Sequence, residues 1–148
     1  MTVRFLPKEA VVLATEIFNR LIQEAGIPVL AIAGNHDSNE RLEYGAELLA
    51  GSQLYIEGTV KEDVRKVTID GINFYLLPFA DHVTIRKLLE DEDIRDLQDA
   101  TRKQVESITA TMDRNEVNIL IAHGYIVNGA KRLGGSVGFR TSAEYRDG

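Results

Sequence analysis

The chain has 148 residues, no cysteine, and 17 basic against 23 acidic residues, so its formal net charge is −6. The absence of cysteine excludes disulfide frameworks, iron–sulfur clusters and thiol catalysis, and it fits a cytoplasmic protein. No apolar run approaches the roughly 20 residues that span a bilayer, so we expect no membrane association. The acidic balance does not indicate strong electrostatic binding to nucleic acid.

The first part of the chain has the pattern of a helix followed by a buried strand. Pro7 suits a helix start, and apolar residues then recur every three or four positions, which predicts a helix to about Ala25 that ends at Gly26. Residues 29–33 are apolar at every position, which is typical of a parallel strand covered on both faces. Helix, turn and buried strand make half of a βαβ crossover, so we predict an α/β fold.

The remaining elements follow from turn signals and periodicity. Ser38 or Asn39 can cap a second helix, and Asp70-Gly71 is the dipeptide of a tight hairpin turn. The other predicted elements are strands at 54–58, 64–69, 72–77 and 118–122, helices at 83–89 and 97–112, and a glycine-rich, poorly structured tail at 128–148. We therefore expect one domain segment over residues 1–127 and a tail over 128–148.

Two predicted buried strands each end in a motif that contains a histidine. The first continues into Gly34-Asn35-His36-Asp37, and the second ends directly on His123. If the two strands are parallel neighbours, Asn35, His36 and His123 converge at the edge of the sheet where α/β proteins bind ligands. Imidazole nitrogen and amide oxygen are donors that suit Mn, Zn or Fe.

Three neighbouring residues are candidates for a supporting role. Gly34 and Gly124 would let the backbone turn sharply or approach a ligand closely. Asp37 could orient an imidazole, or it could hold its loop through backbone hydrogen bonds.

Structural explanations compete with this hypothesis. His123 alone could be a satisfied structural residue, and Asn-His-Asp alone could be a turn with a helix cap. We interpret His82 as a surface or capping residue, and the acidic stretch 90–96 as a solvated face and not a metal site. The presence of both histidine motifs on strands of the same type favours the functional interpretation.

The Gly-Asn-His-Asp motif after a buried strand resembles the signature of calcineurin-like metallophosphoesterases, and its flanks resemble the SbcD-type nuclease subunits of bacterial SbcCD complexes. The resemblance runs roughly from residue 7 to residue 128. It is carried by Pro7, Glu9-Ala10-Val11, the segment 27–38, Glu40-Arg41-Leu42, Gly45, and the segments 76–80 and 121–124. It implies a layered sandwich of helices on a mixed β-sheet, of which this chain would hold a central part, incomplete at both ends.

The resemblance also implies roles for three residues. Asn35 and His123 would be ligands of the second metal of a dimanganese centre, and His36 would assist the oxygen that departs from the scissile phosphate. The parent activity would be a double-strand DNA exonuclease and single-strand endonuclease used in DNA repair, recombination and replication. The implied partners are DNA ends and an SbcC-like ATPase subunit.

The chain lacks other motifs of the family, namely the Asp-x-His, Gly-Asp and Gly-His-x-His motifs. Two neutral ligands cannot hold a divalent ion tightly without carboxylates, so we expect the isolated chain to be inactive. Alternatives are a metallophosphoesterase acting on small phosphoesters and a non-catalytic association module. Because missing strands would expose sheet edges and apolar helix faces, we also expect a homo-oligomer.

Overall fold

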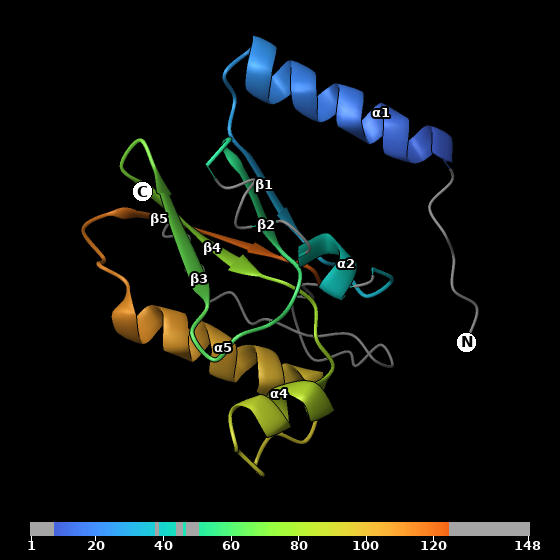
Figure 1. Ribbon diagram of the computed structural model, residues 1–148. Helices are drawn as coiled ribbons and strands as arrows, with labels where there is room; N and C mark the ends of the chain where they lie inside the picture. The colour runs from blue at the N-terminus through green and yellow to red at the C-terminus, as the bar shows by residue number, and fades with distance from the viewer. Residues whose placement is uncertain (1–7, 38, 44–45, 47–50, 125–148) are drawn as a thin grey trace, which may run out of the picture.

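The computed structural model describes residues 8–37, 39–43, 46 and 51–124. The predicted tail at 128–148, and with it the proposed boundary near residue 127, lies outside the described residues. The described part is α/β, as predicted. Its strands form two small sheets, and its helices lie around them (Figure 1). The elements are α1 (Lys8–Asn19), η1 (Arg20–Glu24), β1 (Val29–Ile32), α2 (Asn39–Glu43), β2 (Leu54–Glu57), β3 (Arg65–Ile69), β4 (Ile72–Leu77), α4 (His82–Leu88), α5 (Leu97–Thr111) and β5 (Val117–Ala122).

The N-terminal helix ends at the predicted residue but with a wider last turn. After Asn19 the α-helix continues as one π-helical turn, in which the backbone N–H of Ala25 donates to the carbonyl of Arg20 at 3.0 Å. Gly26 then takes a φ of +63°, a conformation that favours glycine, and terminates the helix. Within the described part of the chain, no helix is both long and apolar enough to cross a membrane.

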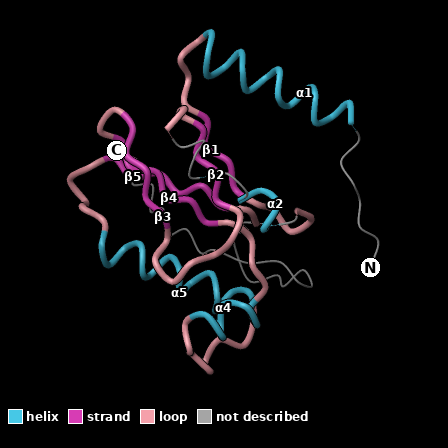
Figure 2. The backbone as a smooth tube through the Cα atoms, in the orientation of Figure 1, coloured by secondary structure: helices cyan, strands magenta, loops and turns pink. Residues whose placement is uncertain are grey.

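The strands form one parallel pair and one three-stranded mixed sheet. β1 and β2 pair in parallel, from Val29 opposite Leu54 onwards. The second sheet has the order β3-β4-β5, with β3 antiparallel and β5 parallel to the central β4. The predicted hairpin between β3 and β4 is confirmed, because Asp70 and Gly71 both have positive φ, as a primed two-residue turn requires. Figure 2 shows the strands of both sheets gathered at the centre of the molecule, with α1 outside them.

The two strands that end in histidine motifs are not neighbours, contrary to the premise of the sequence prediction. β5 pairs with β4, and β1 pairs with β2. The end of β1 reaches β4 through one hydrogen bond, from the backbone N–H of Phe79 to the carbonyl of Ala33 at 2.9 Å. β4 therefore stands between the two strands, and both of them run parallel to their own partner toward the same edge.

The prediction that β5 is a buried strand is wrong for the described part of the chain. Val117, Ile119 and Leu120 are 58%, 40% and 41% exposed. Val117 and Ile119 point to one face of the sheet and Leu120 to the other, so both faces of β5 are open. The apolar residues of β5 led to the prediction of buried faces, but amino-acid composition does not identify the segment that packs on those faces. The other strand, β1, is half-buried along its whole length.

The main apolar core lies where α4 and α5 meet. Its buried members are Val60, Ile85, Ile94 and Ala100. Ile94 comes from the acidic stretch 90–96, which is therefore anchored by one apolar side chain, while its Asp91 pairs with Lys103 at 2.8 Å.

The structure shows where His82 lies relative to the cap of α4. His82 is the first residue of the helix, and the cap is Asp81, whose carboxylate accepts from the backbone N–H of Thr84 at 2.8 Å. The capping role proposed for His82 is therefore filled by its neighbour.

Candidate metal-binding edge

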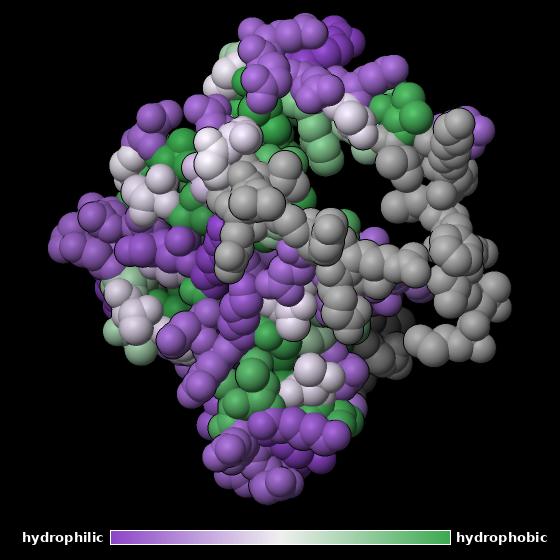
Figure 3. Space-filling view, viewed as in Figure 1, coloured by the Kyte–Doolittle hydropathy of each residue, from purple (hydrophilic) through white to green (hydrophobic). Residues whose placement is uncertain are grey.

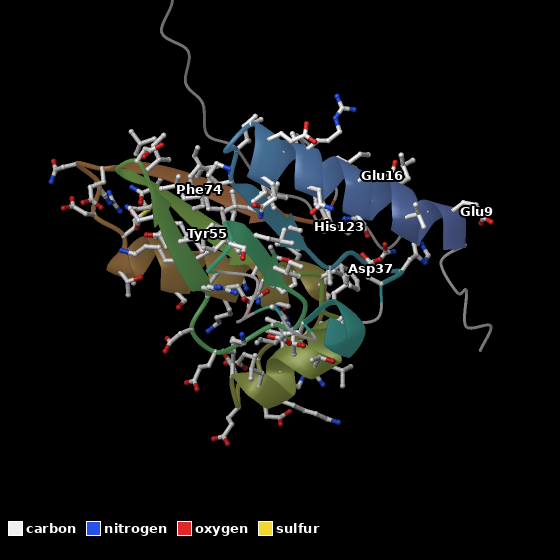
Figure 4. All side chains as sticks on the ribbon, turned by 45° about the horizontal axis from the view of Figure 1, so that its top comes forward. Glu9, Glu16, Asp37, Tyr55, Phe74 and His123 are labelled. Carbon is white, nitrogen blue, oxygen red and sulfur yellow. The ribbon has the colours of Figure 1, made fainter. Side chains whose placement is uncertain are left out.

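Asn35 and His123 meet although 88 positions separate them in the sequence. The Nε2 atom of His123 lies 3.2 Å from the Oδ1 atom of Asn35, within hydrogen-bond distance. Asn35 lies in the loop after β1, and His123 is the first residue after β5. In Figure 4, His123 and Asp37 lie on the same side of the strands. The edge of the sheets thus brings together the amide and the imidazole that the sequence singled out.

Asp37 holds the loop of Asn35 in shape. Its Oδ2 atom accepts a hydrogen bond of 2.7 Å from the backbone N–H of Gly34, and its own N–H donates to the carbonyl of Gly34 at 3.3 Å. Of the two roles that the sequence left open for Asp37, the structure therefore displays the loop-holding one. Within the described residues, the hydrogen bond of its carboxylate comes from the backbone of Gly34.

Gly34 leaves room for the imidazole of His123, which lies against it. A Cβ atom at Gly34 would stand 3.1 Å from Cε1 and 3.2 Å from Nδ1 of that ring, which is tighter than ordinary van der Waals contact. At Gly124, by contrast, a Cβ atom would meet no atom of the described residues within 4 Å. Among the described residues, the close approach expected of the two glycines is therefore seen at Gly34.

Phe79 also contacts the site, although no sequence pattern singled it out as a site residue. Its ring stands perpendicular to the ring of His123, with the two centroids 6.2 Å apart. This edge-to-face arrangement is a favoured geometry for aromatic pairs. Phe79 follows β4, which ends at the same edge as β1 and β5. That position after a strand is the sequence signal that could have identified Phe79 as a site residue.

The loop of Asn35 starts from a firmly held residue, Ala33, which is completely buried. Its backbone N–H donates to the carbonyl of Glu57 at 3.0 Å, and its carbonyl accepts from Phe79 at 2.9 Å. Ala33 is thus tied to the ends of both β2 and β4. Such two-sided anchoring fixes the point from which the loop departs.

An ionic cluster around the buried side chain of Glu57 supports the same side of the site. The side chain of Glu57 is only 2% exposed, and its two carboxylate oxygens lie 2.7 Å from Nζ of Lys61 and 3.1 Å from a guanidinium nitrogen of Arg65. Lys61 also pairs with Glu43 of α2 at 3.0 Å. Hydrogen bonding to Glu57, followed by that to Glu43, raises the pKa of Lys61. The cluster ties β2, β3 and α2 together next to the loop.

Gly58 lets α2 pack directly on the end of β2. A Cβ atom at this position would collide with the backbone carbonyl oxygen of Asn39, the first residue of α2. Because α2 follows the loop of Asn35 so closely, this contact also limits where the loop can lie.

His36 is placed at the turn of the loop and is exposed. Within the described part of the chain, no hydrogen bond or ring contact joins it to Asn35 or His123. Of the three residues expected to converge, the structure therefore brings two into contact, and the third is open to solvent beside them.

The donor pair fits a divalent ion, but it does not complete a metal site. Two ligand atoms at about 2.1 Å from one ion lie roughly 3.0 Å apart at a right angle and roughly 3.4 Å apart at a tetrahedral angle. The 3.2 Å separation of Asn35 Oδ1 and His123 Nε2 falls between these values. Among residues 8–37, 39–43, 46 and 51–124, no group of three or more His, Asp or Glu side chains could hold a metal ion.

The fold and the site define an α/β protein in which an asparagine and a histidine, each following a different strand, lie within hydrogen-bond distance of one another. No family model matches the chain. The chain is 36% identical, over 122 residues, to the SbcD subunit of the nuclease SbcCD from Staphylococcus epidermidis. This match includes 82% of the chain and confirms the resemblance to SbcD-type nuclease subunits. The chain spans about a third of the length of that relative, 33%.

Proposed function

We propose that the chain forms part of the catalytic domain of an SbcD-like, manganese-dependent nuclease that hydrolyses phosphodiester bonds in DNA. The parent activity would be a double-strand exonuclease and single-strand endonuclease in DNA repair, recombination and replication. The name of the relative, which belongs to a nuclease, supports the reaction class. The observation that carries the proposal for this chain is the 3.2 Å approach of Asn35 and His123 across 88 residues of sequence.

In this proposal the residues of the edge have separate roles. Asn35 and His123 hold one metal ion, and Asp37 and Gly34 keep their loop in the required shape. Bound metal pairs in phosphodiesterases supply an activated water and stabilise charge on the attacking and leaving oxygens. His36 is exposed next to the pair, where its imidazole can reach a substrate and donate a proton to the departing oxygen.

We further propose that the 148-residue chain is inactive by itself. Its two site ligands are neutral, and the carboxylate of the same loop, that of Asp37, is engaged with the backbone of Gly34. Divalent ions of this type are normally held with carboxylate help. The remaining ligands would have to come from polypeptide outside the described residues or from a partner.

The test combines metal titration with a nuclease assay. We expect weak Mn²⁺ binding by calorimetry, no cleavage of linear duplex or single-stranded DNA, and at least tenfold weaker Mn²⁺ binding in Asn35→Ala and His123→Ala. His82→Gln, which changes a histidine outside the site, is the matched control and should bind as wild type. Turnover by the isolated, metal-loaded chain would contradict its inactivity. Unchanged Mn²⁺ binding in both site variants would contradict the assigned ligands.

The partners proposed for the parent protein are DNA ends and an SbcC-like ATPase subunit. The relative is named as one subunit of SbcCD, which supports the second of these. A cytoplasmic location is proposed as well, since a cysteine-free sequence suits a reducing compartment. Co-purification with an SbcC-type subunit tests that partner directly.

The open faces of β5 favour a second function, association with another chain. Val117, Ile119 and Leu120 are apolar and exposed, and Val12 and Leu13 of α1 are 47% and 57% exposed. Figure 3 shows apolar side chains at the surface of α1. Exposed apolar strands and helices favour pairing with another copy.

We therefore expect a dimer or larger oligomer by light scattering at high concentration. Leu120→Thr should shift it toward the monomer, whereas Val67→Thr, at a buried position of β3, should lower stability without a specific effect on assembly. A clean monomer of the wild-type chain at high concentration would contradict this function.

A further inference from the structure

The imidazole of His123 is exposed, yet residues that follow two other strands contact it. Asn35 contacts its Nε2 atom at 3.2 Å, and Gly34 offers a position without a side chain at its Cε1 and Nδ1 atoms. Phe79 supplies a further contact, edge-to-face at 6.2 Å between ring centroids. We propose that Phe79 is a positioning residue that sets the orientation of the His123 imidazole at the metal-binding edge.

The backbone of Phe79 makes it suited to this task. Its N–H donates to the carbonyl of Ala33 at 2.9 Å, and Ala33 directly precedes the loop that carries Asn35. Phe79 is therefore fixed to the loop of one ligand through its backbone, while its ring contacts the other ligand. A single residue thus joins the two halves of the donor pair.

Phe79 is less buried than the core residues of β4 that precede it, so its ring is not simply part of the core. Leu76 and Leu77, which precede Phe79, are 1% and 4% exposed and belong to the core. Phe79 is only half-buried, and the ring contact recorded for it is with His123. The ring therefore lies at the margin of the core, next to the imidazole.

A perpendicular ring restrains the imidazole more than an aliphatic side chain of similar size would. The edge-to-face preference acts on the angle between the rings, whereas aliphatic packing has no such directional preference. An imidazole held in this way keeps Nε2 directed at Asn35 Oδ1. In the metal-free chain, a hydrogen bond in that arrangement runs from Nε2–H of His123 to the amide oxygen, because the amide oxygen can only accept.

The inference rests on the proposed metal-binding function, but one measurement is independent of metal. In the metal-free 148-residue chain, long-range proton–nitrogen NMR of the His123 ring should report the Nε2–H tautomer and one side-chain rotamer. Phe79→Leu should give averaged rotamers and a mixture of tautomers. Phe79→Tyr, which keeps the ring, should restore the wild-type spectrum. Phe74→Leu is the matched control, because Phe74 is a half-buried aromatic residue of β4 that makes no ring contact with His123 in the described part of the chain.

Mn²⁺ titration of the same proteins gives the second measurement. Affinity should fall about three- to tenfold in Phe79→Leu, recover in Phe79→Tyr and remain unchanged in Phe74→Leu. If Phe79→Leu is unfolded by circular dichroism, Phe79→Met replaces it with a longer, more adaptable side chain.

The two proposals fail in different ways. A folded Phe79→Leu or Phe79→Met protein with the wild-type rotamer, tautomer and Mn²⁺ affinity would overturn the positioning role. Absence of Mn²⁺ binding by the wild-type chain, together with the predicted NMR changes, would overturn the metal site and leave the positioning of His123 supported.

Discussion

The two halves of the candidate site are built in different ways. On the Asn35 side, Ala33 is fully buried, Glu57 is 1% exposed and α2 rests on Gly58. On the His123 side, β5 is open on both faces, with Val117 58% exposed. The segment that carries Asn35 is therefore packed and hydrogen-bonded by other described residues. His123, by contrast, follows a strand with exposed apolar side chains on both faces.

This difference shows how an exposed site can be preorganised on one side only. The loop of Asn35 is held by backbone hydrogen bonds and an ionic cluster, whereas His123 depends on contacts with the opposite half. Changes on the Asn35 side should therefore cost folding stability. Changes at the contacts of His123 should mainly alter its orientation and its affinity for metal.

The largest expected effect is that of Glu57→Gln. The substitution removes the charge that both Lys61 and Arg65 contact, and we expect a loss of about 2–3 kcal/mol in the free energy of unfolding. The loss stays in this range because the side chains of Lys61 and Arg65 are 52% and 27% exposed and can regain water. Urea unfolding measures it. Glu62→Gln, at an exposed neighbour, serves as control, and equal stability of both variants would contradict the importance of the cluster.

Gly58→Ala should have the next largest effect. The added Cβ atom collides with the backbone of Asn39, so α2 must move away from β2, and such overpacking costs about 1–3 kcal/mol. Gly124→Ala is the matched control, because a Cβ atom there meets no atom of the described part of the chain within 4 Å. Thermal unfolding compares the two. A Gly58→Ala protein as stable as wild type would show that α2 is not held at this point.

Gly34→Ala tests the His123 side and should cost less than about 1 kcal/mol of stability, because the exposed imidazole can swing away. Its effect should appear in the site instead. We expect loss of the nuclear Overhauser contact between residue 34 and the His123 ring, and Mn²⁺ binding weakened severalfold. Gly124→Ala again provides the control. Retention of that contact in Gly34→Ala would mean that the backbone adjusts where we expect the ring to move.

The smallest expected effect is that of Glu43→Gln. A hydrogen bond from Thr59, with further help from Lys61, lowers the pKa of the Glu43 carboxyl below its usual 4.5. Its contribution is therefore present above pH 4.5 and is lost as the pH falls through the lower folded-state pKa. Because the pair lies near the surface, we expect a few tenths of a kcal/mol at neutral pH.

Urea unfolding of wild type and Glu43→Gln at several pH values checks this prediction. The stability difference should be present at about pH 7 and disappear in acid. A difference that persists unchanged in acid would indicate that the side chain acts through packing and not through its charge.

Local signals in the sequence were sufficient for several elements. The Asp70-Gly71 turn was predicted from residue types that tolerate positive φ, and the end of the first helix at Gly26 follows from the same property. Predictions that required knowledge of neighbours were less successful. The sequence left open whether β1 and β5 are neighbours, because apolar composition indicates a strand without identifying its partner, and in the structure they belong to different sheets.

The site shows the same division. Its polar residues after the two strands were found from residue types and position alone, and the resemblance to SbcD-type subunits was carried by the same motif. Phe79 was missed as a site residue because its role depends on the direction of a ring, and a sequence contains no such information. The choice between two roles for Asp37 likewise required the position of the Gly34 backbone N–H.

The sequence by itself determined the helix and strand types, the hairpin turn and the identity of the donor residues, because these depend on side-chain chemistry and on neighbours within a few positions. Only the tertiary structure decided which strand stands beside which and that Asn35 meets His123. It also revealed how unequally the two ligands are supported. Those features arise from contacts between segments far apart in the chain, where burial and steric fit select one arrangement among many that the same local patterns allow.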